Sequence, residues 1–198
     1  MNLKFICAIL VFFFCEVVIA QVPIPADGKC PTFENCTDKN FKFDAKLLIG
    51  YNYLISSVPY FFQVDQKCTW FNITQSTNTL LLVEKYETDV ETHKVRNTDG
   101  IVDYKDGANV LFKYTDLELP MYFKAVLTHP DYAVFLACND CGFFSKTGAG
   151  IYAYGVSKVP WPSCDIVKII NAKLNECGIS NNYIKTENQD GCTQCKKP

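Results

Sequence analysis

The sequence has little of what catalysis and nucleic-acid binding usually require. It contains only two histidines, His93 and His129, and no Ser-His-Asp pattern forms around either of them. Its formal net charge is −2, so it has no basic surface of the kind that binds nucleic acid or holds a protein on anionic lipid. We therefore predict that the protein is not an enzyme, does not bind nucleic acid, and requires neither a metal nor a cofactor.

Long apolar runs are also lacking after residue 20. No later segment reaches about 18 unbroken apolar residues, so we expect no stable membrane insertion. The first residues differ, because Lys4 precedes an apolar run over 5–14 and Ala20 ends a stretch suited to cleavage. The sequence predicts a signal peptide over 1–20 and a secreted, extracellular protein with a single domain over 21–198.

Most of the mature chain has the pattern of short antiparallel strands at regular spacing. The expected strands are 47–62, 66–74, 79–87, 90–96, 109–114, 121–129, 131–138 and 151–158. The stretch 97–100 is typical of a turn, and 101–105 either extends the fourth strand or forms a separate piece. About eight such strands favour an all-β fold, either an up-and-down barrel or a sandwich.

The apolar period then changes to that of a helix. Four residues share one helical face: Ile166, Ile169, Ile170 and Leu174. Ser163 is suited to cap the N-terminus, Asp165 complements the helix dipole, and Gly178 is the expected left-handed stop. We expect one helix to pack on the strands, and 179–184 is a candidate for a further short strand.

Cysteine is abundant, with eleven residues in the full chain, of which Cys7 and Cys15 leave with the signal peptide. The others mostly pair in an oxidising compartment. Two Cys-x-x-Cys motifs, 138–141 and 192–195, have no nearby histidine and are too far apart for a zinc ribbon. The odd number of remaining cysteines predicts one thiol that is free or paired between chains.

Five stretches carry a resemblance to a known family. They are GKCP (28–31), AKLLIGYNYLISSVPYFF (45–62), CTWFNIT (68–74), AVLTHPDYAVFLAC (125–138) and NQDGC (188–192). In order and spacing they resemble lipocalins, in particular apolipoprotein D and the insect bilin-binding lipocalins. The resemblance implies an eight-stranded antiparallel up-and-down barrel with one C-terminal α-helix packed outside, and a small hydrophobic ligand held in the barrel.

The same resemblance implies two disulfides that tie the ends of the chain to the barrel. Carried over by position, Cys30 pairs with Cys138 and Cys68 pairs with Cys192. Each bridge closes a long loop and could add on the order of 4 kcal/mol of stability in the chain-entropy model.

Five cysteines then remain. We expect Cys36 to pair with Cys141, because the first implied bridge brings their segments together. Cys164 and Cys177 bracket the helix and would be about 20 Å apart along it, well beyond the ~7 Å limit for a disulfide. That pair therefore requires the helix to end early, and Cys177 with Cys195 is the alternative.

One family feature is changed at the closed end of the implied barrel. Lipocalins carry Gly-x-Trp at the start of the first strand, whereas this chain has Gly50-Tyr51-Asn52. Lys158 matches the basic residue that normally packs over that Trp. A hydrogen bond would replace the cation–π contact, and Tyr53 or Trp161 is a candidate plug for this end.

Strand parity indicates which residues face inward, because successive side chains point to opposite faces of a sheet. Asn72 opens the sequon Asn-Ile-Thr and is expected to face water with a glycan, and Asn35 opens a second sequon. Lys113 and Lys124 also prefer solvent, and the resemblance places the alternation over 152–156 inside. The predicted ligand-binding residues are Thr69, Phe71, Ile73, Val110, Phe112, Tyr114, Phe123, Ala125, Leu127, Tyr152, Tyr154 and Val156.

An apolar, aromatic cavity with a few hydroxyls suits a sterol, retinoid, fatty acid or bilin. The leading hypothesis is a secreted carrier whose bound bilin or lipid is cargo. A second hypothesis is a filled barrel that binds a protein partner through its surface. A third is a scavenger of small amines or eicosanoids, which needs an acidic side chain inside the barrel; Glu84 and Asp103 are the nearest candidates.

Overall fold

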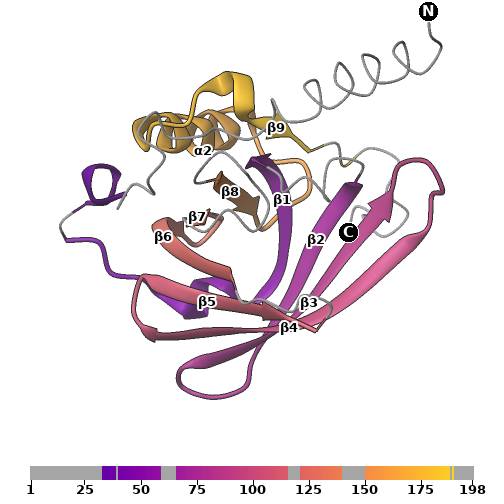
Figure 1. The fold of residues 1–198 in the computed structure, drawn as a ribbon, viewed down its shortest axis with the longest axis horizontal. Coiled ribbons are helices and arrows are strands. Elements are labelled where there is room, and N and C mark those ends of the chain that lie inside the picture. The colour runs from indigo at the N-terminus through magenta and orange to yellow at the C-terminus, as the bar shows by residue number, and fades with distance from the viewer. Residues whose placement is uncertain are drawn as a thin grey trace, which may run out of the picture.

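The protein is an antiparallel β-barrel with one helix packed outside it (Figure 1). The structure, a computed structural model, describes residues 33–38, 40–58, 66–115, 121–139, 150–187 and 189. The barrel strands are β1 (Gly50–Val58), β2 (Gln66–Gln75), β3 (Leu80–Asp89), β4 (Val95–Asp106), β5 (Asn109–Tyr114), β6 (Met121–His129), β7 (Tyr132–Asn139) and β8 (Gly150–Ser157).

Each strand pairs with the next along the chain, and β1 closes the barrel by pairing with both β8 and β2. This connectivity confirms the predicted up-and-down barrel over the alternative sandwich. The predicted signal peptide, 1–20, lies outside the described residues, so its role stays a prediction.

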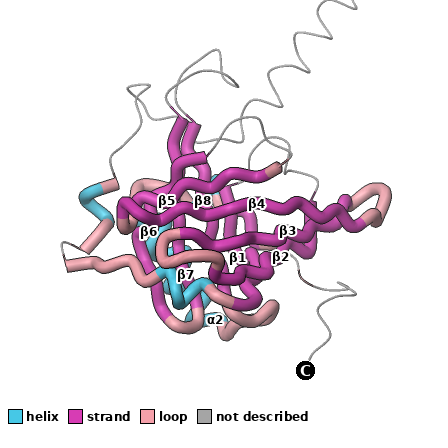
Figure 2. The backbone as a smooth tube through the Cα atoms, turned by 90° about the horizontal axis from the view of Figure 1, so that it is seen from below, coloured by secondary structure: helices cyan, strands magenta, loops and turns pink. Residues whose placement is uncertain are grey.

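The fourth strand differs from the sequence prediction. Residues 90–94 form the turn of the β3–β4 hairpin, which extends past the neighbouring strands (Figure 2), and β4 includes both the expected turn 97–100 and the undecided stretch 101–105. The reason lies at Gly100, where a Cβ atom would meet the Tyr114 ring 2.7 Å away. The glycine therefore leaves room for a neighbouring aromatic ring and does not mark a turn.

Alternation along the strands separates two apolar clusters. The first lies inside the barrel and takes residues from all eight strands, among them Leu54, Val83 and Val102. The second lies between the outer face of the barrel and the helix, and it includes Val58, Val134 and further aliphatic residues. The wall of the barrel is thus buried on both faces along β1, β6, β7 and β8.

The helix α2 (Cys164–Glu176) covers this second cluster. Its N-cap is Ser163, whose side chain accepts a backbone hydrogen bond from the first turn, and Gly178 beyond its end has a φ of +86°. Both ends therefore confirm the predicted start and stop. Ile170 and Leu174 are fully buried and pack the helix against the barrel.

The chain returns to the barrel after the helix. Residues 181–183 form a short 3₁₀ turn, and the strand expected at 179–184 instead lies later, as β9 (Lys185–Thr186). β9 pairs with β1 at Ser56 and Ser57, whereas β2 pairs with β1 only from Gly50 to Tyr53. The C-terminal segment therefore lies beside β1 where β2 no longer pairs with it.

A disulfide joins Cys36 to Cys177, with their Cα atoms 4.9 Å apart. The predicted pair of Cys36 with Cys141 is wrong, and Cys177 pairs with neither Cys164 nor Cys195. The physical reason is that α2 runs its full length, which leaves Cys177 at its C-terminal end beside the 3₁₀ turn that contains Cys36. Cys164, at the other end of α2, is an exposed free thiol.

Two further cysteines of the barrel wall, Cys68 and Cys138, are disulfide-bonded. Their predicted partners, Cys192 and Cys30, lie outside the described residues. The two pairings implied by the resemblance therefore stay predictions.

Helix packing predicts a strong effect at Gly155. A Cβ atom added there would overlap Cγ2 of Ile170, so we expect Gly155→Ala to lower the free energy of unfolding by about 1–3 kcal/mol. Denaturant unfolding measures the change. In an Ile170→Ala background the same glycine substitution should cost almost nothing, because the clashing methyl group is gone; additive effects of the two substitutions would contradict this packing.

Candidate ligand-binding site

The predicted ligand-binding residues mostly face the interior of the barrel. Ten of the twelve are buried members of the inner cluster: Phe71, Ile73, Val110, Phe112, Tyr114, Phe123, Ala125, Tyr152, Tyr154 and Val156. Thr69 is also buried but is not part of this apolar cluster. Whether any of them contacts a ligand stays a prediction.

Leu127 is the exception, and its predicted inward position is wrong. It packs with the outer cluster because the β6–β7 register shifts between Ala125 and Leu127. A β-bulge inserts one residue and reverses the alternation beyond it. The inward face of β6 therefore ends at Ala125.

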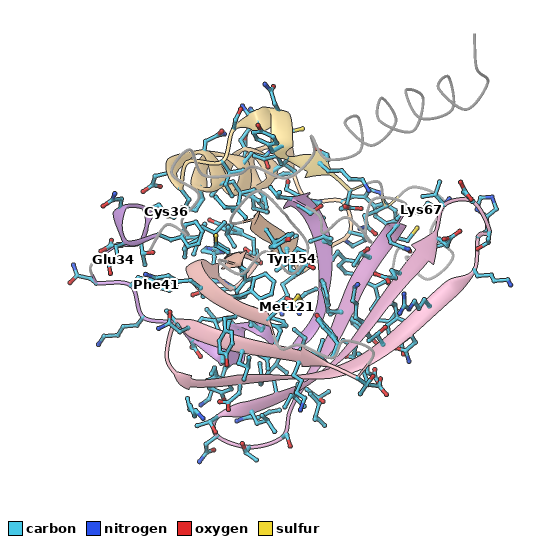
Figure 3. The ribbon with its side chains drawn as sticks, in the orientation of Figure 1. Glu34, Cys36, Phe41, Lys67, Met121 and Tyr154 are labelled. Carbon is cyan, nitrogen blue, oxygen red and sulfur yellow. A yellow bond between two sulfur atoms is a disulfide. The ribbon has the colours of Figure 1, made fainter. Side chains whose placement is uncertain are left out.

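Aromatic rings fill the middle of the barrel. Phe112 and Phe123 pack edge to face with ring centroids 5.0 Å apart, and Phe123 stacks on Tyr154 at 5.3 Å. Phe135, which the sequence reasoning did not select, lies 6.1 Å from Phe112. Tyr154 and Met121 occupy the space enclosed by the strands (Figure 3).

The end of the barrel where β1 begins is closed without the family's Trp. Asn52 is buried, and its amide nitrogen donates to the carbonyl oxygens of Leu48 (2.7 Å) and Gly50 (3.0 Å). The Lys158 ammonium donates to the carbonyl oxygen of Ile49 at 2.9 Å. Hydrogen bonds from Asn52 and Lys158 to one short backbone segment thus take the place of the cation–π contact.

A small cavity lies inside the barrel next to this closed end. Its volume is about 20 Å³, enough for one water molecule. The residues that line it are Leu48, Asn52, Phe71, Ile73, Phe112, Phe135, Tyr154 and Val156. Leu48, in the 3₁₀ turn Ala45–Leu48, closes its floor, whereas Trp161 is 42% exposed. Trp161 is therefore not the plug.

The barrel interior also holds charged side chains, on β3 toward the mouth. Lys85 and Glu87 follow Leu81 and Val83 at every second position along β3, so all four face inward. The two charged side chains form an ion pair and are only 10% and 6% exposed. The Lys85 ammonium also lies 6.0 Å from the centre of the Tyr114 ring. The inner face thus carries a buried charge pair on the mouth side of its apolar cluster.

Two acidic residues that sequence reasoning had considered for the interior lie elsewhere. Glu84 is exposed and accepts a hydrogen bond from Asn72, and Asp103 pairs with Lys105 on the outer side. The expectation was wrong because each residue follows an inward one, Val83 or Val102, and so faces outward. The signal that could have found Lys85 and Glu87 is their shared parity with Leu81.

The strands β1 and β2 separate after Tyr53, and the C-terminal segment adds further polar groups at the gap between them. The Glu187 carboxylate accepts a hydrogen bond from the Ser57 hydroxyl at 2.9 Å and lies 3.7 Å from the Lys185 ammonium. Gln189 donates to the carbonyl oxygens of Leu54 in β1 (2.8 Å) and Thr69 in β2 (3.3 Å). One side chain therefore joins the two strands across the gap.

Comparison with known proteins agrees on the architecture. Lobster apocrustacyanin A1 matches with a TM-score of 0.68 at 13% identity, over 85% of this chain and 94% of that chain. Insecticyanin from the tobacco hornworm Manduca sexta matches with a TM-score of 0.68 at 16% identity, over 85% and 90%. A biogenic amine-binding protein matches with a TM-score of 0.62 at 13% identity, over 85% and 91%.

This chain has the lipocalin fold. No family model and no curated protein sequence matches it. The assignment of the fold therefore rests on structural similarity at low sequence identity. The closer resemblance to apolipoprotein D stays a prediction. Among the described residues of this lipocalin barrel and its flanking segments, no helix is long and apolar enough to cross a membrane.

The two histidines and the two sequons lie on the surface of the lipocalin barrel. His93 is in the β3–β4 turn, and His129 stacks on Tyr132 at the end of β6. Asn35 is exposed in the turn that holds Cys36, and Asn72 lies on the outer face of β2. Both sequon asparagines are therefore placed where a glycan has room, and their glycosylation stays a prediction.

Burial raises the pKa of the Glu187 carboxyl, and Lys185, the Ser57 hydrogen bond and Lys85 act in the opposite direction. Because the pKa is higher in the folded than in the unfolded state, the folded protein binds this proton more strongly. The associated stability is present at low pH and is lost as pH rises through the folded-state pKa.

Glu187→Gln should reverse this loss, because glutamine keeps an oxygen for Ser57 but carries no charge. We expect the variant to gain stability relative to the unsubstituted protein as the pH is raised from about 4 to about 7. Thermal unfolding of both proteins across this range measures the difference in Tm. Parallel curves of Tm against pH would contradict the assignment.

Proposed function

We propose that the protein is a secreted carrier that holds a small hydrophobic ligand, such as a sterol, retinoid, fatty acid or bilin, inside its barrel. The observation that carries the proposal is the convergence of aromatic and aliphatic side chains from all eight strands on one interior space. Removing apolar ligand surface from water there contributes about 25 cal/mol per Å² buried.

Two other features support a secreted carrier. The disulfide between Cys36 and Cys177 suits an oxidising compartment, and the leader sequence 1–20 has the pattern of a signal peptide. The structural neighbours include a protein named for binding biogenic amines. A relation to apolipoprotein D and to bilin-binding lipocalins is part of the same proposal.

Uptake of a ligand at the cavity that the described residues form near Leu48 requires this cavity to enlarge. The cavity near Leu48 holds only about one water molecule, whereas drug-sized ligands need roughly 300 Å³ or more. A ligand that enters this part of the barrel would turn aside the rings of Phe112, Phe123 and Tyr154. Contacts between apolar rings are weak individually, so a bound ligand can replace them with its own.

The same small cavity favours a second candidate function. A barrel filled by its own side chains would act through its outer surface, as a secreted protein that binds a protein partner. Rigid loops held by disulfides suit that role, and the two functions differ in whether the interior takes up a ligand.

Retinol binding tests the proposal directly. We expect native mass spectrometry of the secreted protein to detect an apolar passenger, and the passenger-free protein to bind retinol with increased retinol fluorescence. Ala125→Phe should weaken retinol binding by about tenfold or more, because a ring added to a fully buried inward position occupies ligand space.

Ala153→Phe is the matched control. Ala153 is equally buried but belongs to the outer cluster under α2, so the same overpacking should leave retinol binding unchanged in the folded variant. Failure of the protein to take up retinol, fatty-acid and bilin probes, together with the absence of a passenger, would favour the filled barrel.

A further inference from the structure

The interior of the barrel has two parts of different chemistry, an apolar cluster to which all eight strands contribute and a polar part on the side of β1, β3 and the C-terminal segment toward the mouth. We propose that the ligand is an amphipathic molecule whose neutral head group donates a hydrogen bond to Glu187, beside the Lys85–Glu87 pair. A hydroxyl or an amide N–H is the head group in question, and the apolar body lies among the aromatic rings. This inference rests on the carrier function proposed above.

Glu187 is the acceptor because one of its oxygens is buried without a hydrogen bond. Its side chain is 3% exposed, Oε1 accepts from Ser57, and Oε2 has no hydrogen-bond partner in the part of the chain that the structure describes. A buried carboxylate oxygen left unpaired costs free energy. A ligand donor would satisfy it.

The register of the strands aims Glu187 inward. Ser57 lies opposite both Lys185 of β9 and Tyr154 of β8, so the three side chains share one face of the sheet. Tyr154 belongs to the inner cluster, and Glu187 follows Lys185 by two residues on that face. The positive charge of Lys85 also acts on Glu187, where it opposes the rise in pKa that burial causes.

The balance of charge explains why the head group is neutral. Lys85 pairs with Glu87, and Lys185 pairs with Glu187, so among the described residues each of the two buried glutamates has a lysine beside it. A ligand carboxylate would face both glutamates, and an ammonium group would face both lysines. Either would leave a buried charge uncompensated, which is strongly unfavourable.

Retinol and retinoic acid provide a matched pair of probes, because they share one apolar body and differ in the head group. We expect retinol to bind about tenfold or more tightly than retinoic acid at pH 7.5, the ratio that one hydrogen bond to a charged group supports. Glu187→Gln should reduce that ratio, because an amide accepts from a hydroxyl and donates to a carboxylate. Glu84→Gln, on the outer face, should leave the ratio unchanged.

The outcomes separate this inference from the carrier function. Equal affinities, or tighter binding of retinoic acid, would overturn the head-group assignment while leaving the carrier in place. Failure of both probes to bind would count against the carrier itself. The ratio in the unsubstituted protein decides the matter even if Glu187→Gln does not fold.

A second inference comes from the outer face of the barrel, where aromatic rings lie in a row. Trp70 stacks on Tyr86 with ring centroids 4.0 Å apart, and Tyr51 meets Trp70 at 5.6 Å. Tyr51 is 56% exposed. The three side chains form an aromatic row across β1, β2 and β3 that solvent reaches at Tyr51.

The sequon asparagine lies within this aromatic row. Asn72 is directly opposite Tyr51 in the β1–β2 register, and it follows Trp70 by two residues on the same face of β2. We propose that Asn72 is glycosylated and that the first sugar of the glycan packs on the Tyr51 ring. The C–H bonds of a pyranose ring suit the negative face of an aromatic ring.

The attachment leaves the local hydrogen bond intact. A bond forms from Asn72 Nδ2 to C1 of the sugar, the bond from C1 to the pyrophosphate of a lipid-linked oligosaccharide breaks, and one amide proton is lost. Nδ2 donates to Glu84 Oε2 at 2.9 Å, and its remaining N–H keeps that contact. The glycan would thus cover an exposed aromatic surface.

A double-mutant cycle between glycan and ring tests this. With protein secreted from animal cells, we expect intact mass to show a glycan lost in Thr74→Ala, and this loss to lower Tm by about 2–4 °C. In a Tyr51→Ala background the same loss should leave Tm nearly unchanged, whereas Tyr51→Phe, which keeps the ring, should retain the effect.

Tyr122→Ala is the control on a distant exposed ring, since Tyr122 is 69% exposed on β6. It should leave the effect of the glycan on Tm unchanged. An unmodified Asn72, or a glycan effect that is the same with and without the Tyr51 ring, would overturn the inference. Trimming the glycan to its first sugar should preserve the Tm.

Discussion

The structure depends on one constraint, which is that side chains alternate between the two faces of a sheet that closes on itself. Closure gives the two faces of the sheet different surroundings. Inward residues such as Phe112 and Tyr154 pack in the inner cluster, whereas outward residues meet either solvent or the outer cluster under α2. Because closure leaves few strand edges to be paired from inside, the interior is free to differ in chemistry from one side to the other.

That freedom produces the polar and apolar parts of the interior. The Lys85–Glu87 pair is held within the wall by the same alternation that buries Leu81 and Val83. The gap between β1 and β2 would expose this part to solvent, but β9 and Gln189 cover it. The C-terminal segment therefore completes the wall of the barrel and supplies Glu187 to its interior.

Much of this architecture could be predicted from the sequence, because strand parity and helix capping are local. Capping placed Ser163 at the helix start, and parity put Tyr154 on one face with Tyr152 and Val156, a face that the resemblance to lipocalins placed inside. Parity failed at Leu127, where a bulge in β6 reversed it. The sequence analysis did not select Lys85, although it shares the inward parity of Leu81 and Val83. The Cys36–Cys177 bridge was not predictable, because spatial proximity across 141 residues depends on the docking of α2.

The most direct test of the account is a crystal structure of the protein with retinol bound. The account predicts that the polyene lies inside the barrel among Phe112, Phe123 and Tyr154, with those rings turned aside and the hydroxyl within hydrogen-bond distance of Glu187. Retinol bound only on the outer surface, with the three rings in their present positions, would contradict it.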